Sequence, residues 1–229
     1  MMRSVLSAVL LCLFLASVAM SAEFSADMVM DGMGGTNSGK LYFKNDDISR
    51  TEMMGMISIT KRPMIYQLFE DTKKYVVTNI DEAKDKNPMA DVGSFEEWIK
   101  KNKLRKVGTE TLEGYRCDIF EGDVKFSEEH DPVHMKVWYN KKLGYPLKHE
   151  STLPQVGGKI VSYLKNIRLE KQPDSLFDIP AGYSEAKNMQ EAMGMGGMPS
   201  MGQGGNGQAP SQEDMEKMMK EMMKRMEKQ

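Results

Sequence analysis

Apolar and polar residues alternate with a period of two along most of the chain between Glu23 and Tyr183. The clearest runs are residues 24–30 and 133–139, where every second side chain is apolar. Shorter runs of the same kind occupy residues 41–44, 47–53, 55–61, 64–70, 73–80, 105–112, 115–121, 147–153 and 159–169. This alternation is typical of strands that place one face on a core. About ten or eleven strands in succession predict a mainly β fold built as an antiparallel meander.

One helix interrupts the predicted strands. Ser94 is followed three residues later by Glu97, which is the spacing of a capping box at a helix N-terminus. Phe95 and Trp98 lie on one side of the first helical turn. We therefore expect these two aromatic side chains to pack the helix onto the sheet.

The first 22 residues have the pattern of a secretory signal peptide. Arg3 precedes an apolar run at residues 5–18, and small residues follow it. A run of 14 residues is shorter than the roughly 20 needed to span a bilayer, so a retained anchor is the weaker interpretation. Small residues allow cleavage after Ala19, Ser21 or Ala22, and we place it after Ala22. We expect no transmembrane span in the mature chain.

The composition changes after the last predicted strand and turn. We assign residues 23–184 to one β domain and residues 185–210, rich in Gly and Met, to a flexible linker. Residues 211–229 predict an amphipathic helix whose apolar face is made of methionine alone. That stripe consists of Met215, Met218, Met219, Met222, Met223 and Met226.

The composition of the chain argues against nucleic-acid binding and disulfide bonds, and the chain is unusually rich in methionine. The chain has 229 residues and a formal net charge of −2, which argues against nucleic-acid binding. Cleavage after residue 22 leaves Cys117 as the one cysteine, so the mature chain forms no internal disulfide and depends on its core for stability. Of the 23 methionines, eleven lie between Met189 and Met226.

Candidate catalytic and metal-binding patterns are weak. Residues 34–40 match most of a phosphate-binding loop, but Leu41 replaces the required Ser or Thr and a strand follows, so we expect a hairpin loop. His130 and His134 are four residues apart with Pro132 between them, which favours a surface loop over a metal site. We expect Cys117 to be a buried strand residue and His149 a strand surface residue. No nucleophile motif is present, so we expect neither enzymatic activity nor a cofactor.

Three interpretations of the methionine stripe stay open. The helix can pack on its own domain or self-associate, or it can offer an adaptable surface to an apolar partner. Thioethers are also soft ligands that select Cu(I) or Ag(I), although no His or Cys accompanies them after His149.

Three segments resemble a known family. They are VGTETLEGYRC at residues 107–117, VWYN to LGYPLK at residues 137–148, and SLFDIPAGY at residues 175–183. Over residues 23–184 the chain resembles the exported family called domain of unknown function 4412. That family is similar in layout to the periplasmic lipoprotein carrier LolA and its partner LolB. The resemblance implies a curved, incompletely closed half-barrel wrapped around a helix, which in some relatives holds an acyl chain.

Together these observations predict an exported, non-enzymatic, chaperone-like binding protein of the cell envelope, placed in the periplasm of a Gram-negative bacterium. Its ligand would be a lipid or acyl chain, or an exported protein partner. The alternatives are soft-metal binding through the methionine tail and an adaptor helix for an envelope assembly. The sequence does not predict an oligomeric state.

Overall fold

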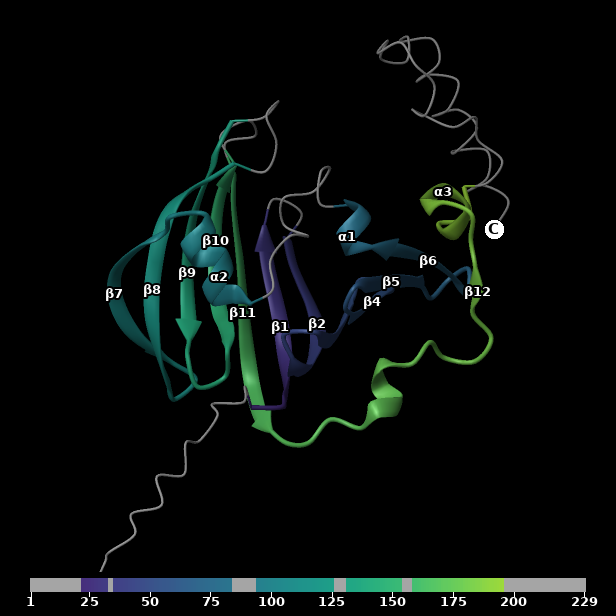
Figure 1. The fold of residues 1–229 in the computed structure, drawn as a ribbon, viewed down its shortest axis with the longest axis horizontal. Coiled ribbons are helices and arrows are strands. Elements are labelled where there is room, and N and C mark those ends of the chain that lie inside the picture. The colour runs from purple at the N-terminus through teal and green to yellow at the C-terminus, as the bar shows by residue number, and fades with distance from the viewer. Residues whose placement is uncertain (1–21, 33–34, 84–93, 126–130, 154–157, 196–229) are drawn as a thin grey trace, which may run out of the picture.

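The computed structural model describes residues 22–32, 35–83, 94–125, 131–153 and 158–195 (Figure 1). In this part of the chain, twelve strands form a single sheet. The strands are β1 (Phe24–Gly32), β2 (Gly35–Asn45), β3 (Ile48–Met53), β4 (Met56–Lys61), β5 (Met64–Phe69), β6 (Lys74–Asn79), β7 (Arg105–Leu112), β8 (Tyr115–Val124), β9 (Val133–Asn140), β10 (Tyr145–Leu153), β11 (Gly158–Leu169) and β12 (Ser184–Glu185). The helices are α1 (Ile80–Ala83), α2 (Phe95–Lys101), α3 (Met189–Ala192) and the 3-10 helix η2 (Asp174–Phe177).

The strand order is β12-β6-β5-β4-β3-β2-β1-β11-β10-β9-β8-β7. The two edge strands, β12 and β7, do not pair with each other, so the sheet is curved but not closed. All neighbouring strands are antiparallel except β12 and β6. The predicted mainly β, incompletely closed sheet is therefore confirmed.

Helix α2 lies across β9 to β11 on the concave face of the sheet (Figure 1). The predicted capping box is present: Ser94 Oγ accepts from the Glu97 N–H at 3.3 Å, and Glu97 Oε2 accepts from the Ser94 N–H at 3.1 Å. Trp98 is buried against Val137 and Tyr139 of β9. The predicted packing of this helix through its aromatic residues is confirmed.

The opposite face of β3–β6 is covered by the chain that follows β11. Phe177 of η2 is buried in one cluster with Ile57, Ile59 and Leu68. Arg50 Nη1 also donates a hydrogen bond to the Leu176 carbonyl oxygen at 2.9 Å. Figure 1 shows this segment passing along one end of the sheet before it reaches β12. It therefore belongs to the domain and supplies part of its core.

The glycine-rich loop is a hairpin, as predicted. Gly32 pairs with Gly35 across the β1–β2 turn, and the residues that follow are strand rather than helix. Gly39 is required by packing, because a Cβ atom at this position would lie 2.1 Å from the carbonyl oxygen of Glu52 on β3. Gly35 and Gly39 of this motif thus serve strand pairing.

The prediction of a flexible linker from residue 185 is wrong for residues 185–195. Ser184 and Glu185 form β12, and the Ala186 N–H donates to the Tyr75 carbonyl oxygen at 2.8 Å. Asn188 caps α3, where Ala192 is fully buried against β6. Ala186, Ala192 and the cap residue Asn188 anchor the segment. The average composition of residues 185–210 did not indicate these local contacts.

The remaining predictions for the chain ends concern other residues. The signal peptide up to residue 21, linker residues 196–210 and the methionine stripe of 211–229 lie outside the described residues. Among the helices that the structure describes, none has the length and apolar character of a membrane span.

Candidate functional site

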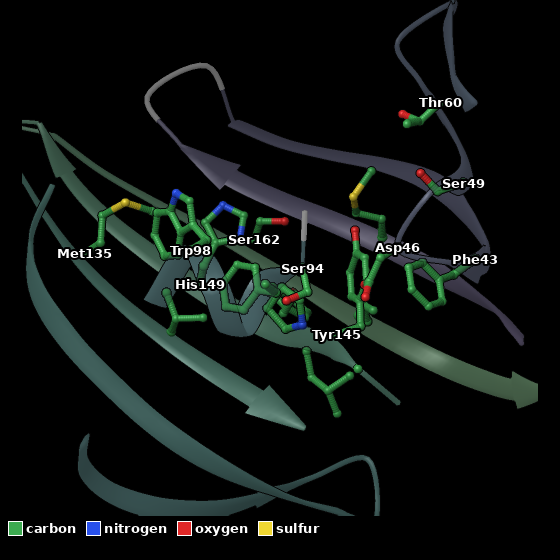
Figure 2. A pocket seen from close by; sticks show the side chains of 18 of the residues that line it. Phe43, Asp46, Ser49, Thr60, Ser94, Trp98, Met135, Tyr145, His149 and Ser162 are labelled. Carbon is green, nitrogen blue, oxygen red and sulfur yellow. The ribbon is translucent and has the colours of Figure 1, made fainter. Parts of the chain in front are cut away.

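A cavity of about 360 Å³ lies between α2 and the concave face of the sheet. Its volume is in the range of small-molecule sites, about 300–1,000 Å³. Most of the lining is apolar, and Figure 2 shows the side chains that surround it. The apolar residues of the lining include Met28, Phe43, Trp98, Val137, Leu147 and Leu164.

Strand register explains why these residues meet. Met28 on β1 is the cross-strand partner of Leu164 on β11. On the neighbouring strands, His149 of β10 lies between Val137 of β9 and Ser162 of β11. Because side chains alternate along each strand, these partners project from the same face. The pairing of the four strands β1, β11, β10 and β9 thus sets this part of the concave wall of the cavity.

Helix α2 covers this wall through stacked aromatic rings. The Phe95 ring lies 5.1 Å from the Trp98 ring and 5.5 Å from the Tyr139 ring of β9, centroid to centroid. Rings at these separations attract each other in addition to the apolar area they bury. The stack holds the first turn of α2 above the sheet and forms the roof of the cavity.

A second aromatic group lies along the cavity. The Tyr145 ring packs edge-on against Phe43 and Phe24, with centroids 5.0 and 5.7 Å apart. Burial raises the pKa of the Tyr145 hydroxyl to about 12. The hydroxyl is therefore neutral at physiological pH, and this part of the lining carries no charge.

Three loops bring charged and polar groups to one end of the cavity, here called the loop end. Asp46 comes from the β2–β3 turn, Arg62 from the β4–β5 turn, and Ser94 precedes α2. Arg62 Nε donates to the Asp46 carbonyl oxygen at 3.3 Å. Burial raises the pKa of the Asp46 carboxyl, and the adjacent Asp47 raises it further.

His149 was expected on the strand surface, and this expectation is wrong. Its side chain is half-buried and faces the cavity beside Ser162, as Figure 2 shows. Burial lowers the pKa of the imidazole, so the ring is neutral near pH 7. In the described part of the chain, neither side chain has a hydrogen-bond partner, and no fully buried polar side-chain atom is unpaired. Their polar atoms therefore open onto the cavity.

The two other histidines, His130 and His134, were weighed as metal ligands, and the structure describes only His134. His134 lies on the opposite face of β9, where Nδ1 is 2.8 Å from Asp123 Oδ1 and Nε2 is 3.2 Å from Glu121 Oε1. These contacts raise its pKa, the hydrogen bond to Asp123 most of all. His130 lies outside the described residues. Within the described ranges, no group of three His, Cys, Asp or Glu side chains is arranged to hold a metal.

Cys117 is a buried strand residue, as predicted. Its side chain is fully buried, and its thiol donates to the Tyr115 carbonyl oxygen at 3.5 Å. Burial raises the thiol pKa to about 11. A neutral, enclosed thiol is a poor nucleophile, so Cys117 acts as a core residue.

The sequence around His149 indicates that its side chain faces inward, but the prediction of a surface residue did not take that pattern into account. Leu147 and His149 share one face of β10, while Lys148 and Glu150 occupy the other. Two charged residues flanking a histidine on a half-buried strand indicate that the histidine faces inward. Asp46 and Arg62 gave no comparable signal, because their proximity depends on how two distant turns meet.

The described surface has one further apolar feature, here called the methionine corner. It consists of the exposed side chains Met54, Met56, Met189, Met193 and Met195. Hydrogen bonds connect the parts that carry it: the Glu70 N–H donates to the Gly55 carbonyl oxygen, and Thr72 Oγ1 donates to that of Ala192. The described chain ends at this corner, with Met195.

Several solved structures are similar to this chain, and the first of them supports the fold. An uncharacterized conserved protein from Thermus thermophilus is 11% identical, with a TM-score of 0.51 over 73% of this chain and 91% of that one. The MucA/MucB complex of Pseudomonas aeruginosa matches at 11% identity and TM-score 0.43, over 70% and 56% of the two chains. A LolA superfamily protein from Nitrosomonas europaea matches at 10% identity and TM-score 0.36, over 69% and 90%.

Sequence comparison gives the family. No curated protein matches this chain. A family model matches residues 23–145, which include the first of the three marker segments and the start of the second. The matched region extends from β1 to the start of β10 and therefore contributes most of the cavity wall and all of α2. The chain belongs to the family described as Domain of unknown function (DUF4412).

Proposed function

We propose that this protein is an exported, non-enzymatic binding protein that holds an apolar ligand in the cavity beneath α2. The observation that carries the proposal is the cavity itself, about 360 Å³ of mostly apolar, partly open space beneath α2. Apolar surface that faces water is unfavourable, and a concave site with a mostly apolar lining and a few polar groups is typical of small-molecule binding. A ligand that enters from the open side and covers this apolar surface therefore accounts best for the cavity.

The polar residues of the cavity support binding rather than catalysis. Ser162 and His149 are neighbours, as a nucleophile and its base would be, but they share no hydrogen bond, and no described carboxylate orients the imidazole. The backbone groups of β10 and β11 pair with each other, so they offer no oxyanion hole. Among the residues that the structure describes, the cavity thus offers no groups that would make Ser162 reactive.

Export follows from the first 22 residues and is part of the same proposal. An envelope location, such as the periplasm of a Gram-negative bacterium, brings the protein into contact with lipids and exported proteins. Determining the N-terminus of protein purified from its host tests this directly. A mature chain that starts at Glu23 supports export, and a chain that keeps residues 1–22 contradicts cleavage.

The binding proposal is tested by displacement of N-phenyl-1-naphthylamine, a neutral apolar dye, by 1-dodecanol. Met28→Trp fills part of the cavity and should weaken dye binding. Met56→Trp is the matched control, because Met56 lies in the exposed methionine corner. Equal dye binding by both variants, or none by the parent protein, would refute a ligand site beneath α2.

A further inference from the structure

The His149 end of the cavity contains two neighbouring polar groups in an otherwise apolar wall. His149 and Ser162 are cross-strand partners, and Val137 is the partner of His149 on β9. Trp98 and Met135 lie beside them in the lining (Figure 2). A hydroxyl or imidazole in apolar surroundings destabilises the folded protein unless the group forms a hydrogen bond. Since the described chain supplies no partner, a ligand in the cavity is placed to supply one.

The charge of the lining limits which polar group fits there. In the described lining, the one Lys or Arg side chain is Arg62, which lies at the loop end beside Asp46. Lys148 and Glu150 flank His149 in sequence but pair with each other at 2.8 Å on the opposite face. A phosphate with two negative charges would find no counter-charge next to His149. A carboxyl group fits better, because it can share a single proton with an imidazole.

Resting on the proposed function, we propose that the ligand is a single-chain carboxylic acid whose carboxyl group binds His149 and Ser162. Ser162 Oγ donates one hydrogen bond, and the imidazole forms the second. The hydrocarbon chain lies along Leu147, Leu164 and Met28 toward Phe43.

The pairing of carboxyl and imidazole couples binding to proton uptake. Burial lowers the pKa of His149, so the unliganded ring is neutral near pH 7. The groups that face it, Trp98, Val137 and Ser162, are uncharged, and the other titratable or charged lining groups are Asp46, Arg62, Tyr145 and Tyr163. A free carboxylate has already lost its proton at this pH. The bound carboxyl–imidazole pair holds one more proton than the free carboxylate and the free neutral imidazole do together, whichever partner carries that proton. The affinity of the protein for the acid therefore rises as pH falls.

Competition between dodecanoic acid and 1-dodecanol for the dye site tests this inference. At pH 6 the acid should bind roughly tenfold more tightly than the alcohol, as a charge-assisted hydrogen bond is stronger than a neutral one. Between pH 6 and 8 its affinity should fall by up to about tenfold per pH unit, while that of the alcohol stays constant. Dodecyl phosphate should bind more weakly than the acid.

Four variants assign the effect to the proposed groups. His149→Phe and Ser162→Ala should each remove most of the preference for the acid and leave dodecanol binding in place. His134→Phe, on the opposite face, and Ser151→Ala, on the same face of β10 but outside the cavity lining, are the matched controls. A cavity that binds dodecanol but shows no preference for the acid overturns this inference and leaves the proposed function intact. A cavity that binds neither molecule contradicts both.

A separate observation concerns the methionine corner. We infer that residues 211–229 of this chain cover it with their methionine stripe. Among the described residues, seven large hydrophobic side chains are exposed, and five of them form this corner. The described chain leads out of the domain there at Met195, and 15 residues separate it from Ser211. A flexible spacer of that length has an end-to-end distance of about 20 Å, so the stripe stays near the corner at high effective concentration.

Paramagnetic labelling of the mature full-length chain tests this contact. Lys220→Cys places a nitroxide on the polar side of the tail, and the buried Cys117 does not take up the label. The methyl signals of Met54 and Met56 should be strongly broadened, and that of Met135 should not. Broadening should persist on dilution and disappear when Met222→Asp and Met223→Asp are added. Broadening of the Met28 signal instead would overturn the inference and place the tail in the cavity. Loss of the broadening on dilution would overturn it as well, and would show that the tail contacts a second copy of the chain.

Discussion

The ring of Phe95 on α2 stacks on the ring of Tyr139 on β9, with centroids 5.5 Å apart and 22° between the ring planes. This contact joins the roof of the cavity to its wall. Phe95→Ala removes the contacts with both Tyr139 and Trp98. We expect the free energy of unfolding to fall by about 2 kcal/mol and dye affinity to fall with it. Urea unfolding and dye titration measure the two effects.

Glu96→Ala is the control for that substitution, because Glu96 is exposed on the same helix. It should change the unfolding free energy by less than about 0.5 kcal/mol. If Phe95→Ala behaves like Glu96→Ala in both measurements, the stacked rings do not hold the roof.

Phe177→Ala should be strongly destabilising, although the residue lies outside the regular strands. Its side chain is 2% exposed and fills the cluster formed by β4 and β5. Truncating a buried phenylalanine costs about 3–5 kcal/mol. Asp174 lies in the same 3-10 helix but is exposed, and Asp174→Ala removes its surface ion pair with Lys44 of β2, so this variant should be far less destabilising. Thermal unfolding that ranks the two variants in the opposite order would contradict the role given to this segment.

The two described histidines should titrate on opposite sides of their ordinary pKa, about 6.5. The contacts with Asp123 and Glu121 raise the pKa of His134, so its contribution to stability is complete below pH 6.5 and is lost as pH rises through the raised value. Burial lowers the pKa of His149, so the unfolded state binds its proton more readily and stability falls as pH decreases below 6.5. Proton NMR of the two imidazole rings measures both values. Identical titration of the rings would rule out the buried position of His149.

Cys117 should resist thiol reagents in the folded protein. Its side chain is fully buried, and its pKa is raised to about 11, so the reactive thiolate is scarce at pH 8. Reaction with Ellman's reagent should follow the rate of unfolding and become immediate in 6 M guanidinium. Stoichiometric reaction of the native protein within minutes would show that the thiol is accessible.

Local sequence patterns were sufficient for most of the fold. Strand alternation and the capping box at Ser94 depend on neighbours within a few residues, and both predictions hold in the structure. Trp138 is an exception to the alternation of β9, because this apolar residue occupies a position on the polar face of the strand. Its side chain is buried on the face opposite Val137, under Lys148, and donates to Glu110 at 2.5 Å. β9 is therefore covered on both faces, which a period of two does not express.

The functional site was less accessible to sequence reasoning, because it depends on long-range contacts. The cavity exists because α2 is held above strands that precede and follow it in the sequence, and no local motif records that arrangement. Residues 185–195 were assigned to a linker because the stretch 185–210 as a whole is rich in Gly and Met. Two alanines pack this segment against Val76, far away in the sequence.

Intermolecular NOEs between unlabelled 1-dodecanol and methyl-labelled protein test the central claim most directly. If the cavity beneath α2 is the ligand site, the alkyl chain should give NOEs to the methyl groups of Met28, Val137 and Leu164, all of which line it. Met54 lies in the exposed methionine corner and should give none. NOEs confined to Met54 and its exposed neighbours, with no signal from the three cavity residues, would contradict the proposed function.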